Sequence, residues 1–373
     1  MKQLYFLEKL LDGVEVEWLP LKDIAVRTRG TRITAAQMKL KHKNSGAVKI
    51  FAGGKTVAFF GYDDLPKENV NNKPSIIVKS RGIIDFEFYN KPFSHKNEMW
   101  SYHSDTNVIK YIFHYLKLQV SYFQGMGSKM QMPQISTPIT DNFLIPIPFP
   151  NDPKKSLEIQ NEIVRILDTF IELTTELTTE LTNRKKQYQY YREQFFDFDD
   201  EVERIKLGQV ARIKNGKDWK KLKSGKFPVY GSGGVMTFVD QYAYNKPTVL
   251  IPRKGSITNI FYVEEPFWNV DTIYYTEINT ELVIPKFFYY YMRTIDLLQL
   301  DTGSGRPSLT QAILNEILVP IPSLSEQQRI VNILGKFDTL TQSISEGLPR
   351  EIELRQKQYE YYRDQLFNFS KPE

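Results

Sequence analysis

Basic and aromatic side chains gather in the irregular segments of this chain, between short β-like runs. Arginine and lysine can neutralise phosphates, and Arg, Gln, Asn and Ser can hydrogen-bond to base edges in the DNA major groove. For any one of these residues a solvated surface charge is the simpler interpretation. As a set they occupy matching places in two halves of the chain, which favours nucleic-acid binding. The candidates are Arg27, Arg29, Arg32, Lys41, Lys79, Arg81, Lys129 and Gln131 in the first half, and Lys217, Trp219, Lys220, Arg253, Lys254, Ser304 and Arg306 in the second.

Motifs for catalysis are missing from the sequence. There is no Walker A loop, no dinucleotide-binding glycine motif, no zinc-protease or serine-hydrolase motif, and no methyltransferase or nuclease motif. The four histidines share no metal-ligand spacing. The glycine-rich stretches 231–234 and 303–305 lack the Lys-Ser/Thr of a phosphate loop, and they predict tight turns. The sequence therefore predicts no catalytic residues, no metal site and no cofactor bound to this chain.

One stretch of the sequence occurs twice in the chain. Residues 184–198 and 355–369 are identical at ten of fifteen positions, in the pattern QYxYYRxQxFxF. Such a match indicates an internal duplication, and a repeat constrains the architecture more strongly than any local pattern. Residues 4–14 predict a short helix and resemble residues 190–202, so the N-terminus looks like the tail of a repeat whose body lies at the C-terminus. This circular arrangement predicts chain ends that are close in space.

The regions before each long repeat also match one another. The run NKPSIIVKSRG (72–82) corresponds to NKPTVLIPRKG (245–255), and Pro-Ile-Pro closes both blocks. Short runs at residues 48–51, 56–60, 75–78 and 83–89 predict strands, because β-branched and aromatic residues lie between Gly, Asn, Asp and Pro. The loops differ between the blocks: residues 30–44 have no counterpart like 216–226. A shared scaffold with different loops predicts two similar sites with different preferences.

A long helix follows each block, from about Ser156 to Phe198 and from about Ser325 onwards. Apolar residues recur in steps of three and four along both segments, which predicts paired, antiparallel helices of about 40 residues. The first helix contains the tandem repeat TELT-TELT (175–182), and extra steps of four act as stutters. Gly347 and Pro349 interrupt the second helix and predict a kink.

Length and composition exclude several classes of protein. With 373 residues the chain is too long for a single compact core, and its 41% hydrophobic and 25% charged content is typical of a globular protein. No apolar run approaches 18 residues, which predicts no membrane span, and the absence of cysteine fits a reducing compartment such as the cytoplasm. A net charge of +5 permits a nucleic-acid partner without requiring one.

The order of these elements resembles the specificity subunit (HsdS) of type I restriction–modification systems, over essentially the whole chain. The resemblance rests on LEKLLDGVEVEWLPL (7–21), the two PIP-then-helix junctions, SEQQRIVNIL (325–334), the TELT repeats and the doubled QYxYYRxQxFxF. The first and fourth of these resemble the type IC group. The second long helix lacks a TELT repeat and has the stretch GLPR instead. This departs from the family pattern and leaves the spacer length open.

The resemblance implies an α+β fold in which two pseudo-twofold-related target recognition domains are separated by two long antiparallel coiled-coil helices. Its expected parts are residues 1–150 (first recognition domain), 151–200 (central helix), 201–322 (second recognition domain) and 323–373 (C-terminal helix). Each recognition domain would read one half of a split double-stranded DNA sequence, at a gap set by the four-residue repeats.

The resemblance also implies partners. Two modification (HsdM) subunits would methylate adenine with S-adenosylmethionine, and restriction (HsdR) subunits would add ATP-driven cleavage. On the helical wheel Tyr190, Arg192, Tyr361 and Arg363 face away from the apolar stripe, so they are the predicted contacts with HsdM. Two alternatives remain open from the residues themselves: a coiled-coil scaffold whose globular blocks bind protein, and a self-sufficient methyltransferase.

Overall fold

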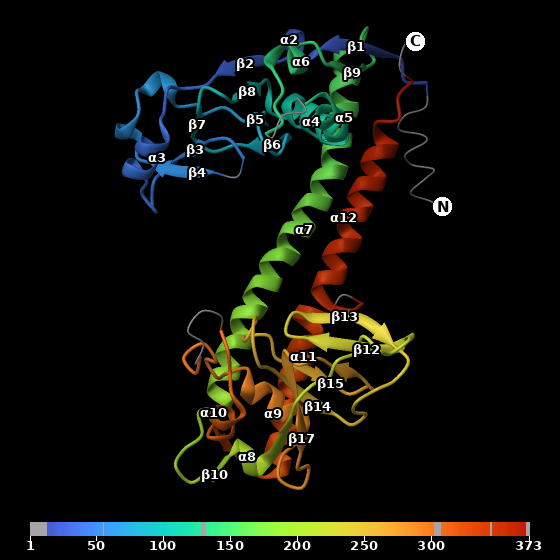
Figure 1. Ribbon diagram of the computed structural model, residues 1–373. Coiled ribbons are helices and arrows are strands. Elements are labelled where there is room, and N and C mark those ends of the chain that lie inside the picture. The colour runs from blue at the N-terminus through green and yellow to red at the C-terminus, as the bar shows by residue number, and fades with distance from the viewer. Residues whose placement is uncertain (1–12, 55, 128–131, 302–306, 344, 371–373) are drawn as a thin grey trace. The chain divides into compact units, whose positions relative to one another are not determined.

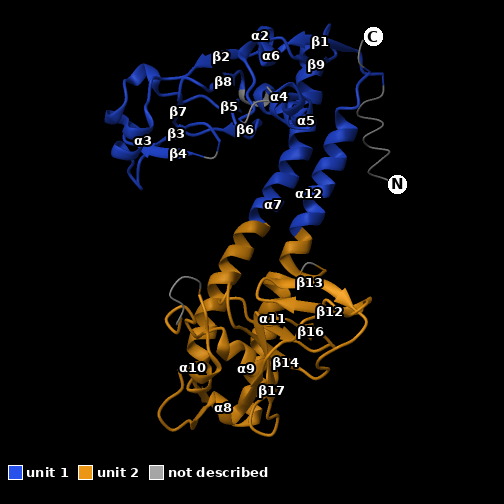
Figure 2. Ribbon diagram, viewed as in Figure 1, with its two compact units in different colours: residues 1–176, 352–373 blue, residues 177–351 orange. Residues whose placement is uncertain are grey.

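The computed structural model describes residues 13–54, 56–127, 132–301, 307–343 and 345–370 (Figure 1). The chain forms two compact units, coloured separately in Figure 2: unit 1 comprises residues 1–176 and 352–373, and unit 2 comprises residues 177–351. The helix predicted at residues 4–14 lies almost entirely outside the described residues. Along the described ranges, no helix is both long enough and apolar enough to cross a membrane.

Unit 1 contains two sheets and a separate strand pair. The larger, antiparallel sheet has the order β2 (Val26–Arg29), β8 (Trp100–His103), β5 (Ser75–Lys79) and β6 (Asp85–Tyr89). The smaller sheet has the order β4 (Val57–Phe60), β3 (Val48–Phe51) and β7 (Phe93–His95), with β7 parallel to β3. The strands β1 (Val16–Pro20) and β9 (Leu144–Pro148) form the antiparallel pair. All four strands predicted from the sequence are confirmed, with bounds that differ by no more than two residues.

Unit 2 repeats this arrangement strand for strand. Its larger sheet has the order β11 (Ala211–Lys214), β17 (Ile273–Ile278), β14 (Thr248–Pro252) and β15 (Phe261–Val263). Its smaller sheet has the order β13 (Gly234–Val239), β12 (Ser224–Gly231) and β16 (Trp268–Asn269), and β16 is parallel to β12. The strands β10 (Arg204–Lys206) and β18 (Leu318–Pro320) form the matching pair. The identical strand orders confirm the duplication and the α+β class predicted from the sequence.

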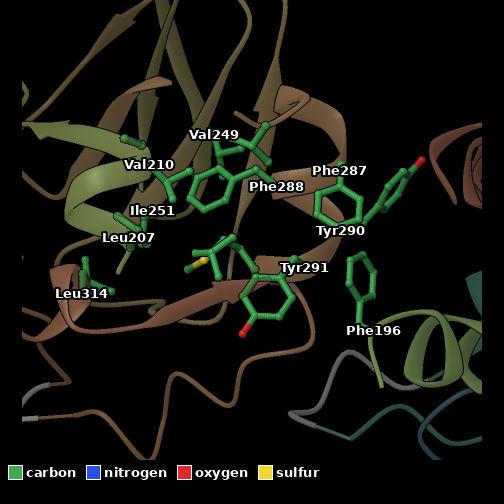
Figure 3. Close-up of a cluster of buried hydrophobic side chains, with 14 of the residues drawn as sticks. Phe196, Leu207, Val210, Val249, Ile251, Phe287, Phe288, Tyr290, Tyr291 and Leu314 are labelled. Atoms are coloured by element: carbon green, nitrogen blue, oxygen red, sulfur yellow. The ribbon is translucent and has the colours of Figure 1, made fainter. Parts of the chain in front are cut away.

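Short helices complete each unit. Unit 1 has α2 (Leu21–Ile24), α3 (Ala35–Lys41), α4 (Thr106–Leu118), α5 (Val120–Met126) and α6 (Thr137–Asp141), and unit 2 has α8 (Leu207–Val210), α9 (Pro285–Met292) and α10 (Gln311–Asn315). Aromatic residues of α9 pack with the aliphatic residues of β14 to form the core of unit 2 (Figure 3). Phe196, at the end of the first long helix, joins this core with its ring 5.2 Å from that of Phe287. The repeated aromatic motif therefore contributes directly to the core.

The first long helix, α7 (Pro153–Phe195), is unbroken over 43 residues. It begins three residues before the predicted start, because proline is accepted in the first helical turn. The side chain of Asp152 accepts a hydrogen bond from the Lys155 N–H at 3.0 Å, which satisfies one of the free N–H groups of that turn. The helix also ends three residues before the predicted Phe198.

The second long helix is two helices, α11 (Leu324–Gln342) and α12 (Gly347–Leu366). Gly347 has a φ angle of +78°, and a Cβ at this position would lie 2.3 Å from the carbonyl oxygen of Thr339. Glycine is therefore required where α12 begins. The single helix of about 40 residues expected from the sequence is wrong, and the predicted kink at this place is a complete break.

Each unit contains an antiparallel helix pair. In unit 1, α7 and α12 lie side by side and run in opposite directions, and the rings of Phe170 and Tyr362 stack at 5.1 Å (Figure 1). In unit 2, α7 pairs with α11: the ring centroids of Tyr188 and Phe337 lie 6.0 Å apart, and Arg329 lies over the ring of Phe195. The antiparallel pairing predicted from the apolar stripe is confirmed within each unit.

The long helices also bury a second face, which a heptad pattern alone does not predict. In unit 1, Val164 and Leu167 are buried against the sheets and short helices, and Val331 and Leu334 are the counterparts in unit 2. The C-terminal end reaches the same region of unit 1, because the Trp18 indole N–H donates to the Ser370 carbonyl at 3.2 Å. This contact confirms the circular arrangement predicted from the repeat, since residue 370 lies beside the first strand.

The ring contacts correct one detail of the repeat. Phe88 and Tyr262 hold equivalent strand positions, opposite the second residues of β5 and β14. Their ring partners on the following helices are Phe113 at 5.9 Å and Tyr289 at 5.7 Å. Phe113 therefore corresponds to Tyr289, and not to Phe288 as matching of the sequences predicts.

A glycine shared by both blocks, Gly30 or Gly216, lies where two chain segments cross. A Cβ added at either glycine would lie 2.1 Å from a backbone carbonyl oxygen, that of Lys96 in unit 1 or Val270 in unit 2. A hydrogen bond from the next residue fixes each crossing: in unit 2, the Lys217 N–H donates to the carbonyl of the neighbouring segment at 2.9 Å. Only a residue without a side chain fits this approach.

We expect Gly216→Ala to lower the free energy of unfolding by about 1–3 kcal/mol, because the added methyl group must displace backbone. Urea denaturation of the full chain measures the change. Gly233→Ala is the matched control, since a Cβ at position 233 meets no atom within 4 Å. Equal midpoints for the two variants would contradict the explanation.

Candidate nucleic-acid interface

In unit 1 the turn that follows β5 pairs with a segment from farther along the chain. The Gly82 N–H donates to the Pro133 carbonyl at 2.8 Å, and the Ile135 N–H donates to the Ser80 carbonyl at 3.0 Å. Gly82 has a φ angle of +78°, which favours glycine. These residues, called paired turn 1, carry an exposed Arg81 at their tip.

Unit 2 contains the same feature, called paired turn 2. The Gly255 N–H donates to the Pro307 carbonyl at 3.1 Å, and the Leu309 N–H donates to the Arg253 carbonyl at 2.7 Å. Gly255 has a φ angle of +88°, and the exposed tip residue is Lys254. Two stretches that were matched separately in the sequence are thus brought together, in the same way, in both units.

A β-hairpin tip lies beside each paired turn. In unit 2 the Ser232 N–H, at the tip between β12 and β13, donates to Thr272 Oγ1 at 3.2 Å, and the Arg253 N–H donates to the Thr272 carbonyl at 2.9 Å. The glycine-rich stretch 231–234 is therefore the tight turn predicted from the sequence. Unit 1 has a hollow that is lined both by the tip between β3 and β4 and by Arg81.

This hollow in unit 1 has a volume of about 570 Å³, and most of its charged lining residues are cations. Lys39, Arg81 and Lys96 line it together with one carboxylate, Glu98. Burial opposes the charge of Glu98, but the hydrogen bond from Lys96, with 2.9 Å between Nζ and Oε1, and the charge of Arg81 hold the pKa of this carboxyl below its ordinary value. The hollow can therefore offer N–H donors to phosphates and base acceptors, and a carboxylate acceptor to an amino group. No three His, Asp or Glu side chains among the described residues lie close enough to share a metal ion.

Three of the predicted DNA-contact residues are engaged inside unit 1. Arg27 forms an ion pair with Asp141 at 2.7 Å, and Lys79 forms one with Glu87, also at 2.7 Å. The Lys41 ammonium donates to a backbone carbonyl of the β4–β5 connection at 2.9 Å. These contacts hold elements of unit 1 together and leave the side chains of Arg27 and Lys79 only 28% and 23% exposed.

The other predicted residues are distributed over the surface of their units. Arg29, Arg32, Lys217 and Lys220 are exposed, and Arg253 is half-buried. Trp219 packs against buried valines of the smaller sheet of unit 2. Lys254 forms an ion pair with Asp271 at 2.8 Å in which both side chains are about half exposed, so the pair is weak. Four candidates lie outside the described residues: Lys129, Gln131, Ser304 and Arg306.

The predicted partner contacts divide into two kinds. Tyr190 and Tyr361 are 57% and 48% exposed. Arg192 and Arg363 are half-buried, and each guanidinium lies over the ring of the tyrosine four residues before it, at 5.8 Å in α7 and 5.5 Å in α12. The tyrosines are therefore open to solvent, whereas the arginines contact their own units.

Sequence reasoning misses several residues of these surfaces. Lys96 and Glu98 line the hollow, but two opposite charges two residues apart look like an ordinary solvated pair in a sequence. Met236 and Phe238 are exposed on β13, although apolar residues in a strand are usually assigned to a core. The absence of strict alternation in GVMTFV (234–239) is the one signal that distinguishes this strand.

A buried polar residue occupies the same position behind each interface. His95 in unit 1 and Asn269 in unit 2 both end the strand that runs parallel to the hairpin, and both are buried. His95 Nε2 hydrogen-bonds to Ser101 Oγ at 3.1 Å, and the Asn269 amide donates to the Ile273 carbonyl at 2.8 Å. Burial lowers the pKa of His95 from 6.5 to about 4, because the charged ring cannot be hydrated there.

Acidification is expected to destabilise the fold through His95. The pKa of His95 is lower in the folded chain than in the unfolded chain. Its contribution to the free energy of unfolding is therefore fully present above pH 6.5 and is lost as the pH is lowered towards 4. Between pH 7.5 and 5 the loss is about 2 kcal/mol. His95→Asn, which introduces the residue of unit 2, should remove this part of the pH dependence when urea denaturation is measured at both values. An unchanged pH dependence in the variant would contradict the assignment.

Comparisons with known proteins agree with this geometry. The family model described as "Type I restriction modification DNA specificity domain" matches residues 13–186 and 199–354. The chain is 37% identical to the EcoR124I/EcoR124II type I restriction enzyme specificity subunit of Escherichia coli, over 100% of this chain and 99% of that protein. It is 31% identical to the EcoprrI specificity subunit of Escherichia coli, over 93% of each chain.

The fold is also that of a solved relative. The crystal structure of the type I restriction–modification S subunit from M. genitalium matches with a TM-score of 0.67 and 20% identity, over 96% of this chain and 98% of that one. The chain therefore belongs to the type I restriction–modification DNA specificity family, and its function is DNA sequence recognition rather than that of a scaffold for proteins.

Proposed function

We propose that this specificity subunit reads a bipartite DNA target, one half-site with each unit, and so directs adenine methylation and restriction by partner subunits. The paired turn carries the proposal, because each unit presents a cation, Arg81 or Lys254, at the same point of the same backbone framework. The surrounding loops differ, as two different half-site sequences require. Two recognition units joined in one chain suit half-sites that lie about one helical turn of DNA, or about 34 Å, apart.

In this proposal the partner subunits carry the chemistry. Two HsdM subunits dock against the duplicated helix surface, of which Tyr190 and Tyr361 are the exposed members. A surface that occurs twice offers two equivalent docking positions, which supports two copies of the partner. HsdR subunits join the full complex, S-adenosylmethionine and ATP bind to the partners, and this chain, working in the cytoplasm, supplies recognition without catalysis.

The test is a footprint of the full chain, with its modification partner, on the DNA sequence found by mapping methylated adenines in the source genome. We expect two protected half-sites separated by unprotected base pairs. Binding that involves six to ten phosphates should weaken by about 10³–10⁵-fold between 50 and 200 mM salt. A single continuous footprint, or an affinity that ignores salt, would overturn the proposal. Methyl transfer by the purified chain alone would instead support the methyltransferase alternative.

A further inference from the structure

The β12–β13 hairpin of unit 2 exposes three large apolar side chains. Val235, Met236 and Phe238, all on β13, are 49%, 58% and 52% exposed. β13 is an outer strand of its three-stranded sheet. Exposed apolar residues on an outer strand promote association, and proteins normally avoid them there unless the surface binds something.

The corresponding phenylalanine of unit 1 is partly covered by its own chain. Phe59 of β4 holds the register position of Phe238 and is half-buried. The Phe59 N–H donates to His42 Nδ1 at 3.2 Å, and the Lys43 N–H donates to the Phe59 carbonyl at 2.8 Å. In unit 2 the segment that replaces α3 packs Trp219 against the sheet and leaves Phe238 exposed. Val57 of β4 is 44% exposed, much like Val235, so it is the exposure of the phenylalanine that is a feature of unit 2 and not of the shared scaffold.

A β-bulge sets the direction of Met236. Val229 lies opposite Thr237 and Tyr230 lies opposite Val235, so Met236 is an extra residue on β13. The equivalent strands of unit 1, β3 and β4, pair without any shift. Bulges bend a strand and redirect a side chain, often beside a functional site.

The segment that leads into the hairpin is basic. Residues 217–226 contain five lysines and one aspartate, and all five lysines are exposed. The ammonium of Lys226 lies 5.3 Å from the ring centroid of Phe227. At the other end of the hairpin, Thr272 joins the tip to paired turn 2, which carries Lys254. The exposed apolar strand therefore has cations at both ends.

This charge favours nucleic acid over protein as the occupant. Lysine is depleted in protein–protein interfaces, whereas lysines that neutralise phosphates supply most of the non-specific affinity for DNA. A two-stranded β-ribbon fits the DNA major groove, where an apolar side chain can contact the methyl group of thymine.

We propose that unit 2 inserts the β12–β13 hairpin into the major groove of its half-site, with Met236 and Phe238 against base edges and the neighbouring lysines on phosphates. The inference rests on the proposed function. It adds uncharged side chains to the residues that determine sequence at the second half-site.

Phe238→Ala tests the base contact. Binding to the cognate target should weaken roughly ten- to a hundredfold, with discrimination lost at the second half-site and retained at the first. Lys226→Ala should instead weaken binding to all sequences and reduce the salt slope by about 1. Leu298→Ala is the matched control, because Leu298 is 56% exposed in unit 2 but lies outside the hairpin. Wild-type discrimination by Phe238→Ala would overturn the proposal.

A second measurement does not depend on a loss of affinity. The chain contains no cysteine, so Met236→Cys creates a unique thiol for maleimide labelling. Cognate DNA should slow the labelling at position 236 at least tenfold and leave a Leu298→Cys variant unaffected. Protection by the modification subunit in the absence of DNA, with none from DNA itself, would assign the hairpin to a protein partner and overturn the proposal.

The wild-type footprint separates this inference from the proposed function. If the wild-type chain shows no salt-dependent bipartite footprint, the proposed function fails, and the hairpin proposal fails with it. The footprint can also be present while DNA fails to protect position 236 and discrimination at the second half-site does not depend on Phe238. In that case only the role of the hairpin is wrong.

Discussion

Deletion of residues 179–182, one of the two TELT units, should change the preferred gap between the half-sites and leave both half-site sequences unchanged. These residues lie within the unbroken helix α7. Four helical residues account for about 6 Å of length and about 40° of rotation. Since base pairs rise by 3.4 Å, the shift is at most about two base pairs. Mapping methylated adenines in cells that carry the variant measures the gap directly.

The matched control keeps the length of the helix and changes its side chains. Thr179→Ala with Thr182→Ala alters the same TELT unit but removes no residue, so the wild-type gap should remain. A deletion variant that still methylates at the original gap would show that α7 does not determine the spacing. A changed gap in the alanine variant would show that the side chains, and not the length, matter.

The duplicated sequence predicted the organisation of this molecule well, because segments that match in sequence occupy equivalent places in two copies of one fold. The match of residues 72–82 with 245–255 anticipated that β5 and β14 occupy the same place in two identical strand orders. The same match also makes Arg81 and Lys254 equivalent residues, each at the tip of the paired turn in its own unit. The shared Gly30 and Gly216 had no explanation in the sequence, and the crossing carbonyl oxygens supply one.

The candidate interface was less predictable, because ion pairing depends on neighbours that are distant in sequence. Arg27 and Asp141 are 114 residues apart, so no local pattern shows that this arginine is engaged. The apolar stripe predicted one face of each long helix, but Val164 and Leu167 belong to a second face whose partners come from other elements. The exposure of Phe238 likewise depends on the segment that replaces α3, which differs between the two blocks.

Arg81→Ala and Lys254→Ala are expected to weaken recognition of different half-sites. If each tip residue contacts its own half-site, each variant should lose about 1–3 kcal/mol of binding free energy, or roughly 5- to 150-fold in affinity. The two losses should add in the double variant, because the two residues belong to separate compact units. Titrations against targets with base changes in one half-site at a time should show that Arg81→Ala removes discrimination only at the first.

Lys79→Ala provides the control for charge alone, since it removes the same formal charge two residues from Arg81. The Lys79 ammonium is paired with Glu87, which keeps a second partner, Lys49, at 3.0 Å. Removing Lys79 therefore leaves no isolated carboxylate, and we expect its affinity for DNA to fall by less than about threefold. Equal losses from Lys79→Ala and Arg81→Ala would mean that unit 1 attracts DNA by its overall charge. Only a loss confined to Arg81, and to the first half-site, supports a reading position at the tip of paired turn 1.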